Sequence, residues 1–171
     1  MKLSLPTSDL LSQLQTATRV ASSRTSVQAL SGVMISAEAG ELVLLATDME
    51  MGLRVPLAGE VIRPGVVVLP ARLLLEVVRS LPGGSVTLEL RPSEQDVELI
   101  SGAATFHLRT LRAEDFPKLP VPAPETRVTL PAHAFVDTAL AVSRSASKDE
   151  TRPVLTGVLI SASADELRMV A

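Results

Sequence analysis

The stretch Leu30-Ser31-Gly32-Val33-Met34-Ile35-Ser36-Ala37 recurs as Leu155-Thr156-Gly157-Val158-Leu159-Ile160-Ser161-Ala162, 125 positions later. The match extends without a gap over residues 5–46 and 130–171, with 15 identities in 42 positions. A repeat unit of this length has the size of a whole domain, whereas solenoid repeats are about 20 to 50 residues long. We therefore expect one complete domain followed by the opening of a second, in a fragment of a longer protein.

The composition predicts a globular protein of a reducing compartment. Hydrophobic residues make up 46% and charged residues 20% of the 171 positions, which is typical of a chain that buries a core. With three Phe and neither Tyr nor Trp, stacking platforms for single-stranded nucleic acid are not expected. The chain has no Cys, signal peptide or long apolar run, so we predict a cytoplasmic protein that does not enter membranes.

Hydrophobic periodicity predicts two amphipathic helices among short strands in residues 1–118. The first helix follows Pro6-Thr7-Ser8, with Thr7 or Ser8 as its cap, and ends near Val20. The second begins at Pro70, and its apolar stripe ends at Leu81. The expected strands are 2–5, 30–37, 41–47, 51–57, 66–69, 85–90, 96–100 and 104–111. This order predicts an α+β fold with the helices on one face of antiparallel sheet.

A proline-rich linker is expected between the two copies, at residues 119–126. The second copy should then repeat the order of the first: a strand at 127–130, a helix at 131–145, a polar loop at 146–152, and strands to Ala171. Residues 127–171 are thus predicted to be the incomplete start of a second domain.

No residues indicate catalysis, a metal site or a cofactor. Without Cys, a nucleophile would be Ser or Thr beside His107 or His133, but the first falls in an alternating strand and the second in a helix's first turn. Two distant His offer no metal-ligand spacing. Asp48 and Glu50 form a carboxylate pair suited to acid–base work, yet both can equally be solvated, so we predict that the protein is not an enzyme.

The arginines are the remaining chemical signal. The net charge is -3, but residues 38–60 hold five acidic residues against Arg54 alone. The predicted helices and their loops instead carry Arg19, Arg24, Arg72 and Arg79. The last two are seven positions apart, so they share a helix face. They are either ordinary solvated charges or a surface for phosphate, whose contacts are sensitive to salt and independent of sequence.

Four segments closely resemble the bacterial DNA polymerase III beta subunit family, the replication sliding clamps. They are Ala46-Thr47-Asp48-Met49-Glu50-Met51, Leu69-Pro70-Ala71-Arg72, Asp115-Phe116-Pro117-Lys118-Leu119 and Arg152-Pro153-Val154-Leu155-Thr156-Gly157-Val158. The resemblance runs from Met1 to Ala171 with the segments in family order. It agrees with the repeat, because clamps of this family have three similar domains in each subunit.

The resemblance implies a DNA-clamp fold and a non-catalytic processivity factor. Two subunits close head-to-tail into a ring, with sheets outside and helices lining a hole that encircles duplex DNA. The ring tethers the replicative polymerase alpha subunit, the clamp loader and repair proteins through short peptide motifs. The residues implied to face DNA are Gln15, Arg19, Arg24, Arg72, Arg79, Arg144 and Lys148.

Two further surfaces are implied by the same resemblance. Arg152 and Leu155 match the start of the family's peptide pocket, whose remaining wall would follow Ala171. The edge strand near 101–111 matches the first domain's contribution to the homodimer contact. Its residues here are Ala103, Thr105 and His107, of which the first two are neutral.

Two other functions are compatible with the residues alone. One is a protein-binding module of the same fold with no DNA role, which captures clamp-partner peptides. The other, ranked last, is a hydrolase using Asp48 and Glu50. Activity lost in Asp48→Asn would indicate the hydrolase, and tight binding of a partner peptide to residues 1–171 would indicate the module.

Overall fold

A computed structural model describes residues 1–22, 26–119, 127–163 and 166–171. The chain divides into two compact units, Met1–Val121 and Pro122–Ala171, and each is treated by itself. The first unit contains helices α1 (Thr7–Val20) and α2 (Ala71–Ser80). Its strands are β1 (Lys2–Pro6), β2 (Gly32–Glu38), β3 (Glu41–Thr47), β4 (Gly52–Pro56), β5 (Glu60–Arg63), β6 (Gly65–Pro70), β7 (Ser85–Arg91), β8 (Asp96–Ser101) and β9 (Ala104–Arg109).

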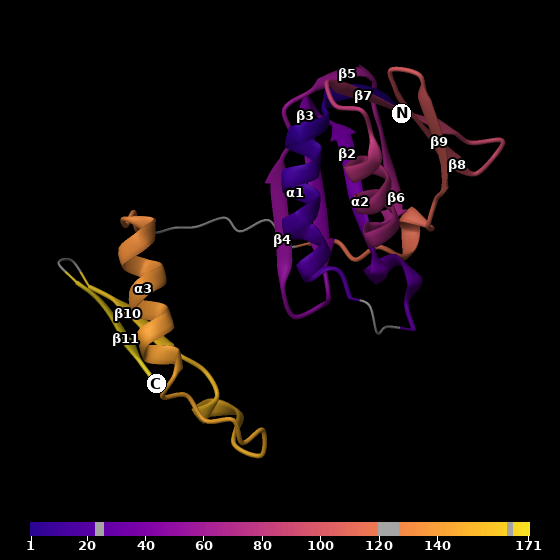
Figure 1. Cartoon of the computed structure of the whole chain (residues 1–171). Coiled ribbons are helices and arrows are strands. Elements are labelled where there is room, and N and C mark those ends of the chain that lie inside the picture. The colour runs from indigo at the N-terminus through magenta and orange to yellow at the C-terminus, as the bar shows by residue number, and fades with distance from the viewer. Residues whose placement is uncertain (23–25, 120–126, 164–165) are drawn as a thin grey trace. The chain divides into compact units, whose positions relative to one another are not determined.

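Two antiparallel sheets and two helices build the first unit (Figure 1). One sheet has the order β4-β3-β2-β6 and the other the order β5-β1-β7-β8-β9. The two helices lie side by side, α1 over β3 and β4 and α2 over β2 and β6. The α+β prediction, with two helices on one face of antiparallel sheet, is confirmed for this unit.

Aliphatic side chains from both helices and both sheets form one core. In α1, Leu10, Leu14 and Ala17 are buried at helical spacing, and in α2 the same holds for Leu74 and Val78. Each helix therefore turns one stripe inward and leaves its opposite face in solvent. A smaller cluster of Ala29, Val68 and Phe116 forms where the short 3₁₀ helices Gln28–Ser31 and Ala113–Asp115 contact β6.

The second unit holds α3 (Ala132–Ser143), a 3₁₀ turn (Pro153–Leu155) and the hairpin of β10 (Leu159–Ala162) and β11 (Leu167–Val170). Helix α3 ends two residues before the predicted end at 145. No large hydrophobic side chain of this unit is buried among its described residues. Of its residues, Leu130, Phe135 and Ile160 are 39, 39 and 49% exposed, whereas their counterparts Leu5, Leu10 and Ile35 are 2, 0 and 0% exposed.

Several predicted details of the first unit are wrong. Pro6 is the N-cap of α1, and neither Thr7 nor Ser8 caps the helix with its side chain. Thr7 is the first helical residue, and its amide donates to the Gly84 carbonyl at 2.8 Å. Residues 30 and 31 belong to a 3₁₀ helix rather than to β2. Strand β9 ends at Arg109, while Leu111 forms an isolated bridge with Val68.

The predicted strand at 127–130 is also wrong, because these residues form no strand. Its counterpart β1 is held between β5 and β7. At the offset of 125, equivalents of those two strands would lie beyond residue 171 of the sequence. Among the described residues no strand pairs with 127–130, and a segment becomes a strand only by pairing with a partner.

Candidate nucleic-acid interface

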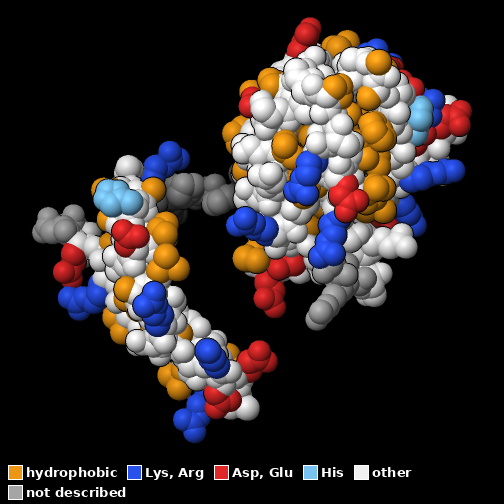
Figure 2. Space-filling view, in the orientation of Figure 1, with side chains coloured by type: hydrophobic (Ala, Val, Ile, Leu, Met, Phe, Trp, Pro, Cys, Tyr) orange, Lys and Arg blue, Asp and Glu red, His pale blue; other side chains and the backbone are white. Residues whose placement is uncertain are grey.

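The solvent-facing sides of α1 and α2 carry most of the predicted DNA-facing residues. Gln15 and Arg19 are exposed on α1, and Arg72 and Arg79 are exposed on α2, opposite Leu74 and Val78. Figure 2 shows basic side chains gathered on the side of the first unit where Figure 1 places these helices. We call this surface, with its residues Gln15, Arg19, Arg72 and Arg79, the helix face. Arg24 lies outside the described residues.

The arginines of the helix face differ from the cations of the sheets in their partners. Within the described residues, the side chains of Arg19, Arg72 and Arg79 have neither an ion pair nor a hydrogen bond. On the sheets, by contrast, Lys2 and Arg63 pair with Glu89 at 2.9 and 2.7 Å, and Arg54 pairs with Glu41 at 2.5 Å. Cations without intramolecular partners are available to an external anion. The helix face is therefore the part of this unit best suited to phosphate.

The predicted dimer-edge residues lie at the edge of the five-stranded sheet that β9 forms. Thr105 and His107 are exposed on β9, which pairs with β8 and is last in the strand order. Ala103 is exposed in the turn before that strand. An edge strand leaves one row of backbone groups open to pairing with another chain, which is the property that a dimer contact of this kind requires.

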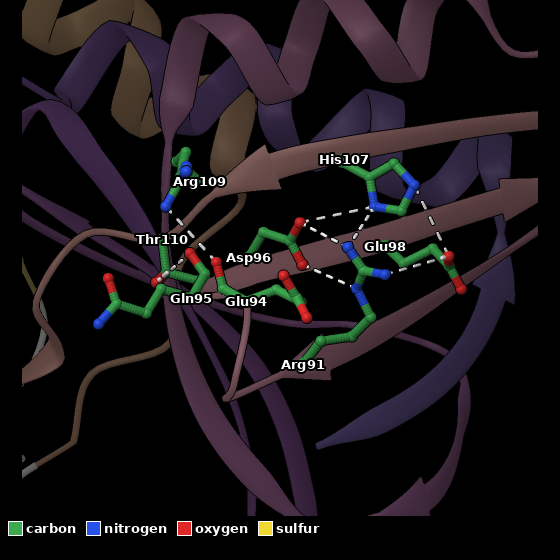
Figure 3. Close-up of polar contacts among 8 residues, drawn as sticks. All are labelled: Arg91, Glu94, Gln95, Asp96, Glu98, His107, Arg109 and Thr110. Carbon is green, nitrogen blue, oxygen red and sulfur yellow. Dashed lines mark hydrogen bonds and ion pairs between the residues drawn. The ribbon is translucent and has the colours of Figure 1, made fainter.

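His107 belongs to a charged cluster on three neighbouring strands (Figure 3). The Arg91 guanidinium donates to both carboxylate oxygens of Asp96, at 2.9 and 2.7 Å. Its Nη2 also lies 2.8 Å from Nδ1 of His107, and Glu98 lies 3.7 Å from Nε2 of that ring. The cluster is internally compensated, so it offers no free cation to DNA.

Asp96 gives the first unit a pH-dependent element. Chiefly through its hydrogen bond, and then through its charge, Arg91 lowers the pKa of the Asp96 carboxyl. A carboxyl with a lowered folded-state pKa stabilises the fold above its unfolded pKa, and that contribution is lost as the pH falls through the folded value. We expect Asp96→Asn to lower the urea midpoint at pH 7, and the difference from the parent to shrink below about pH 4. An equal difference at both pH values would contradict this role.

Asp48 and Glu50 are located in the turn between β3 and β4. Asp48 Oδ1 accepts hydrogen bonds from the amides of Met51 at 2.7 Å and Glu50 at 3.0 Å. The Met51 bond is the largest cause of the lowered pKa of Asp48. A general base near neutral pH requires a raised carboxyl pKa, so the geometry indicates a turn-stabilising role. In the described parts of the chain, no group of three or more His, Cys, Asp or Glu is arranged to hold a metal.

In the second unit, Arg144 is the C-cap of α3 and Lys148 lies in the following loop, both exposed. Arg152 precedes the 3₁₀ turn and Leu155 ends it, 50% exposed. The Leu155 amide donates to the Arg152 carbonyl at 2.9 Å, so the two predicted pocket residues flank one turn.

The second unit also has a shallow apolar hollow that the sequence analysis did not identify. It lies between α3 and β11, and its lining includes Leu130, Phe135, Leu167 and Met169. The repeat contained a signal for it, because the counterparts of these four residues in the first copy are buried core residues. Arg152 and Leu155 do not line it.

The comparisons with known proteins agree with this architecture. Residues 1–120 match the family model of the DNA polymerase III beta subunit, N-terminal domain. The chain belongs to this family. All of it aligns with the beta sliding clamps of Synechocystis sp. and Micrococcus luteus, at 35% identity in each case, over 46 and 54% of those proteins. The chain thus spans about half the length of the curated relatives it matches.

Solved structures of the family give the same fold. The DNA polymerase sliding clamp from Bacillus subtilis matches 99% of this chain with a TM-score of 0.90 and 28% identity, over 46% of its own length. A putative DNA polymerase III beta subunit from Eubacterium rectale matches 99% with a TM-score of 0.93 and 25% identity, over 46% of its length. The predicted family and DNA-clamp fold are confirmed. No helix among the described residues is long and apolar enough to cross a bilayer.

Proposed function

We propose that this chain forms part of a replication sliding clamp, a non-catalytic, ring-forming processivity factor that encircles duplex DNA. Residues 1–118 are its first domain, 119–126 the linker and 127–171 the start of the second domain. One observation carries the proposal. Arg19, Arg72 and Arg79 lie on the exposed face of the two helices, and within the described residues their side chains have neither an ion pair nor a hydrogen bond. The family membership, through relatives named beta sliding clamp, supports it.

The chemistry of the helix face suits sliding. Arginine contacts to phosphate are strengthened by charge but carry no sequence information. Because each contact exchanges with salt counterions, a few of them give weak and mobile binding. In this proposal Gln15 adds a polar contact, Arg24 adds a further cation, and Arg144 and Lys148 serve the second domain in the same way.

The remaining surfaces complete the proposed assembly in the cytoplasm, at the nucleoid. The β9 edge, with Ala103, Thr105 and His107, forms part of a head-to-tail homodimer contact. Arg152 and Leu155 begin the pocket that receives short peptides of the replicative polymerase alpha subunit, the clamp loader and repair proteins. Leu155 is 50% and the adjacent Val154 86% exposed, so neighbouring apolar side chains are available there to a ligand or another segment.

The DNA role is tested by neutralising the helix face. The double variant Arg72→Gln/Arg79→Gln removes two cations that have no recorded partner in the described structure. We expect weaker binding to a mixed-sequence duplex and a salt slope, d log K/d log [salt], reduced by about 2. Fluorescence anisotropy between about 50 and 200 mM salt measures both quantities.

Arg54→Gln is the matched control, because Arg54 lies on β4 and pairs with Glu41. It should leave the salt slope unchanged. Equal slopes in the double variant, the control and the parent would overturn the DNA role of the helix face, and would favour the protein-binding alternative.

A further inference from the structure

Glu76 is the one acidic residue of α2, and it lies between the two arginines of that helix. It follows Arg72 by four positions and precedes Arg79 by three. At about 100° per residue, the three side chains fall within about 60° of the helix circumference, opposite the buried Leu74 and Val78. Figure 2 shows an acidic side chain among basic ones on the side where Figure 1 places the helices. An anion therefore stands within the surface proposed to meet phosphate.

Glu76 has no structural task in the described part of the chain. It is exposed, and neither an ion pair nor a hydrogen bond of its side chain is recorded there. Its position in the middle of α2 (Ala71–Ser80) excludes a cap or a favourable interaction with the positive end of the helix dipole. The acidic residue of α1, Asp9, differs in this respect, since it stands in the first turn, where the dipole favours a negative charge.

The spacing gives Glu76 an effect on both arginines. Oppositely charged side chains at i, i+4 and i, i+3 attract each other across a helix surface. Because no N–O distance is within ion-pair range, the arginines stay free, yet each lies in the field of a neighbouring carboxylate. A phosphate that approaches Arg72 or Arg79 meets this carboxylate as a like charge and as a competitor.

We propose that Glu76 weakens phosphate binding by Arg72 and Arg79, so that contacts with duplex DNA stay short-lived during sliding. This inference rests on the proposed DNA role of the helix face and adds a residue that opposes binding to those that promote it. A helix face with cations alone would hold one position along the DNA for longer, because each phosphate contact would dissociate more slowly.

Glu76→Gln tests the inference in the full 171-residue chain. Gln keeps the length and the helix propensity of Glu, and a thermal melt followed by circular dichroism verifies that folding is unchanged. At about 50 mM salt, we expect the affinity for a mixed-sequence duplex to rise about threefold, and the gain to fall as salt screens the carboxylate. Glu94→Gln, in the exposed turn between β7 and β8 (Figure 3), removes the same charge away from α2 and should have no effect.

A double-mutant cycle tests the proposed route through the arginines. If Glu76 acts on Arg72 and Arg79, the gain from Glu76→Gln should disappear in the Arg72→Gln/Arg79→Gln background. An unchanged affinity in Glu76→Gln, or a gain of equal size in both backgrounds, would overturn the inference. Its failure is distinguishable from failure of the proposed function, because in the second case the double arginine variant itself would bind DNA like the parent.

Discussion

Leu74→Ala should lower the free energy of unfolding of the first unit by about 3 kcal/mol. Leu74 is fully buried on α2, within the core that also holds Leu10 and Leu14 of α1. Truncation removes its contacts within that core and leaves a cavity, because closely packed neighbours relax only in part. Urea denaturation followed by circular dichroism measures the change.

The preceding residue provides the matched control. Leu73 is 46% exposed on the same helix, so Leu73→Ala should change the free energy of unfolding by no more than about 0.5 kcal/mol. The two variants make the same substitution at neighbouring positions of one helix, and the two side chains differ only in whether they face the core or the solvent. Equal effects of the two variants would show that α2 does not pack on α1 through the stripe described above.

Backbone amides of the second unit should exchange with solvent at least about a thousandfold faster than those in the core strands of the first. Ile35 and Ile160 are equivalent positions of the repeat. Ile35 is fully buried on β2, which pairs with β3 and β6, whereas Ile160 is 49% exposed on β10, which pairs with β11. An isolated two-stranded hairpin and a 12-residue helix are each marginally stable in water.

Hydrogen exchange with site resolution compares the exchange rates of both units in the same sample, so pH and temperature are identical for the two. Fast exchange at 155–171 beside slow exchange in β2 and β3 is the expected result. Slow exchange across 155–171 would instead mean that the apolar side chains of the second unit are covered in solution.

Local patterns predicted most elements of the first unit. Both helices were predicted from apolar residues at helical spacing, because such residues form the face that a helix buries. These residues are Leu10, Leu14 and Ala17 in α1 and Leu74 and Val78 in α2, and all of them are buried. The expected strands 30–37 and 41–47 are also observed as a hairpin, and its two turn residues, Ala39 and Gly40, have positive φ, 53° and 80°, as a type I′ turn requires.

What the sequence did not predict depends on contacts between distant residues. Strand β5 (Glu60–Arg63) was missed because all four of its residues are exposed, which leaves no alternating pattern. It is a strand only through its pairing with β1. The strand expected at 127–130 is the opposite case, since its sequence pattern is present but no strand of the described residues pairs with it.

In the candidate site, too, local features were predictable from the sequence and long-range contacts were not. The sequence placed Arg72 and Arg79 on one helix face, since seven positions make about two turns. It could not show that these arginines lack partners while Arg63 has one. Arg63 pairs with Glu89, 26 positions away, because β5 and β7 lie on either side of β1. Whether a cation of the first unit is paired or free thus depends on which strands are neighbours in the sheet and on their register.

In the proposed function, duplex DNA contacts the helix face of the first unit. Amide chemical-shift changes in the ¹⁵N-labelled chain on addition of a mixed-sequence duplex test it most directly, since every exposed face is observed at once. We expect the largest changes in α1 and α2, around Gln15, Arg19, Arg72 and Arg79, and none around His107 on β9. Changes confined to β7, β8 and β9, with α1 and α2 unaffected, would contradict it.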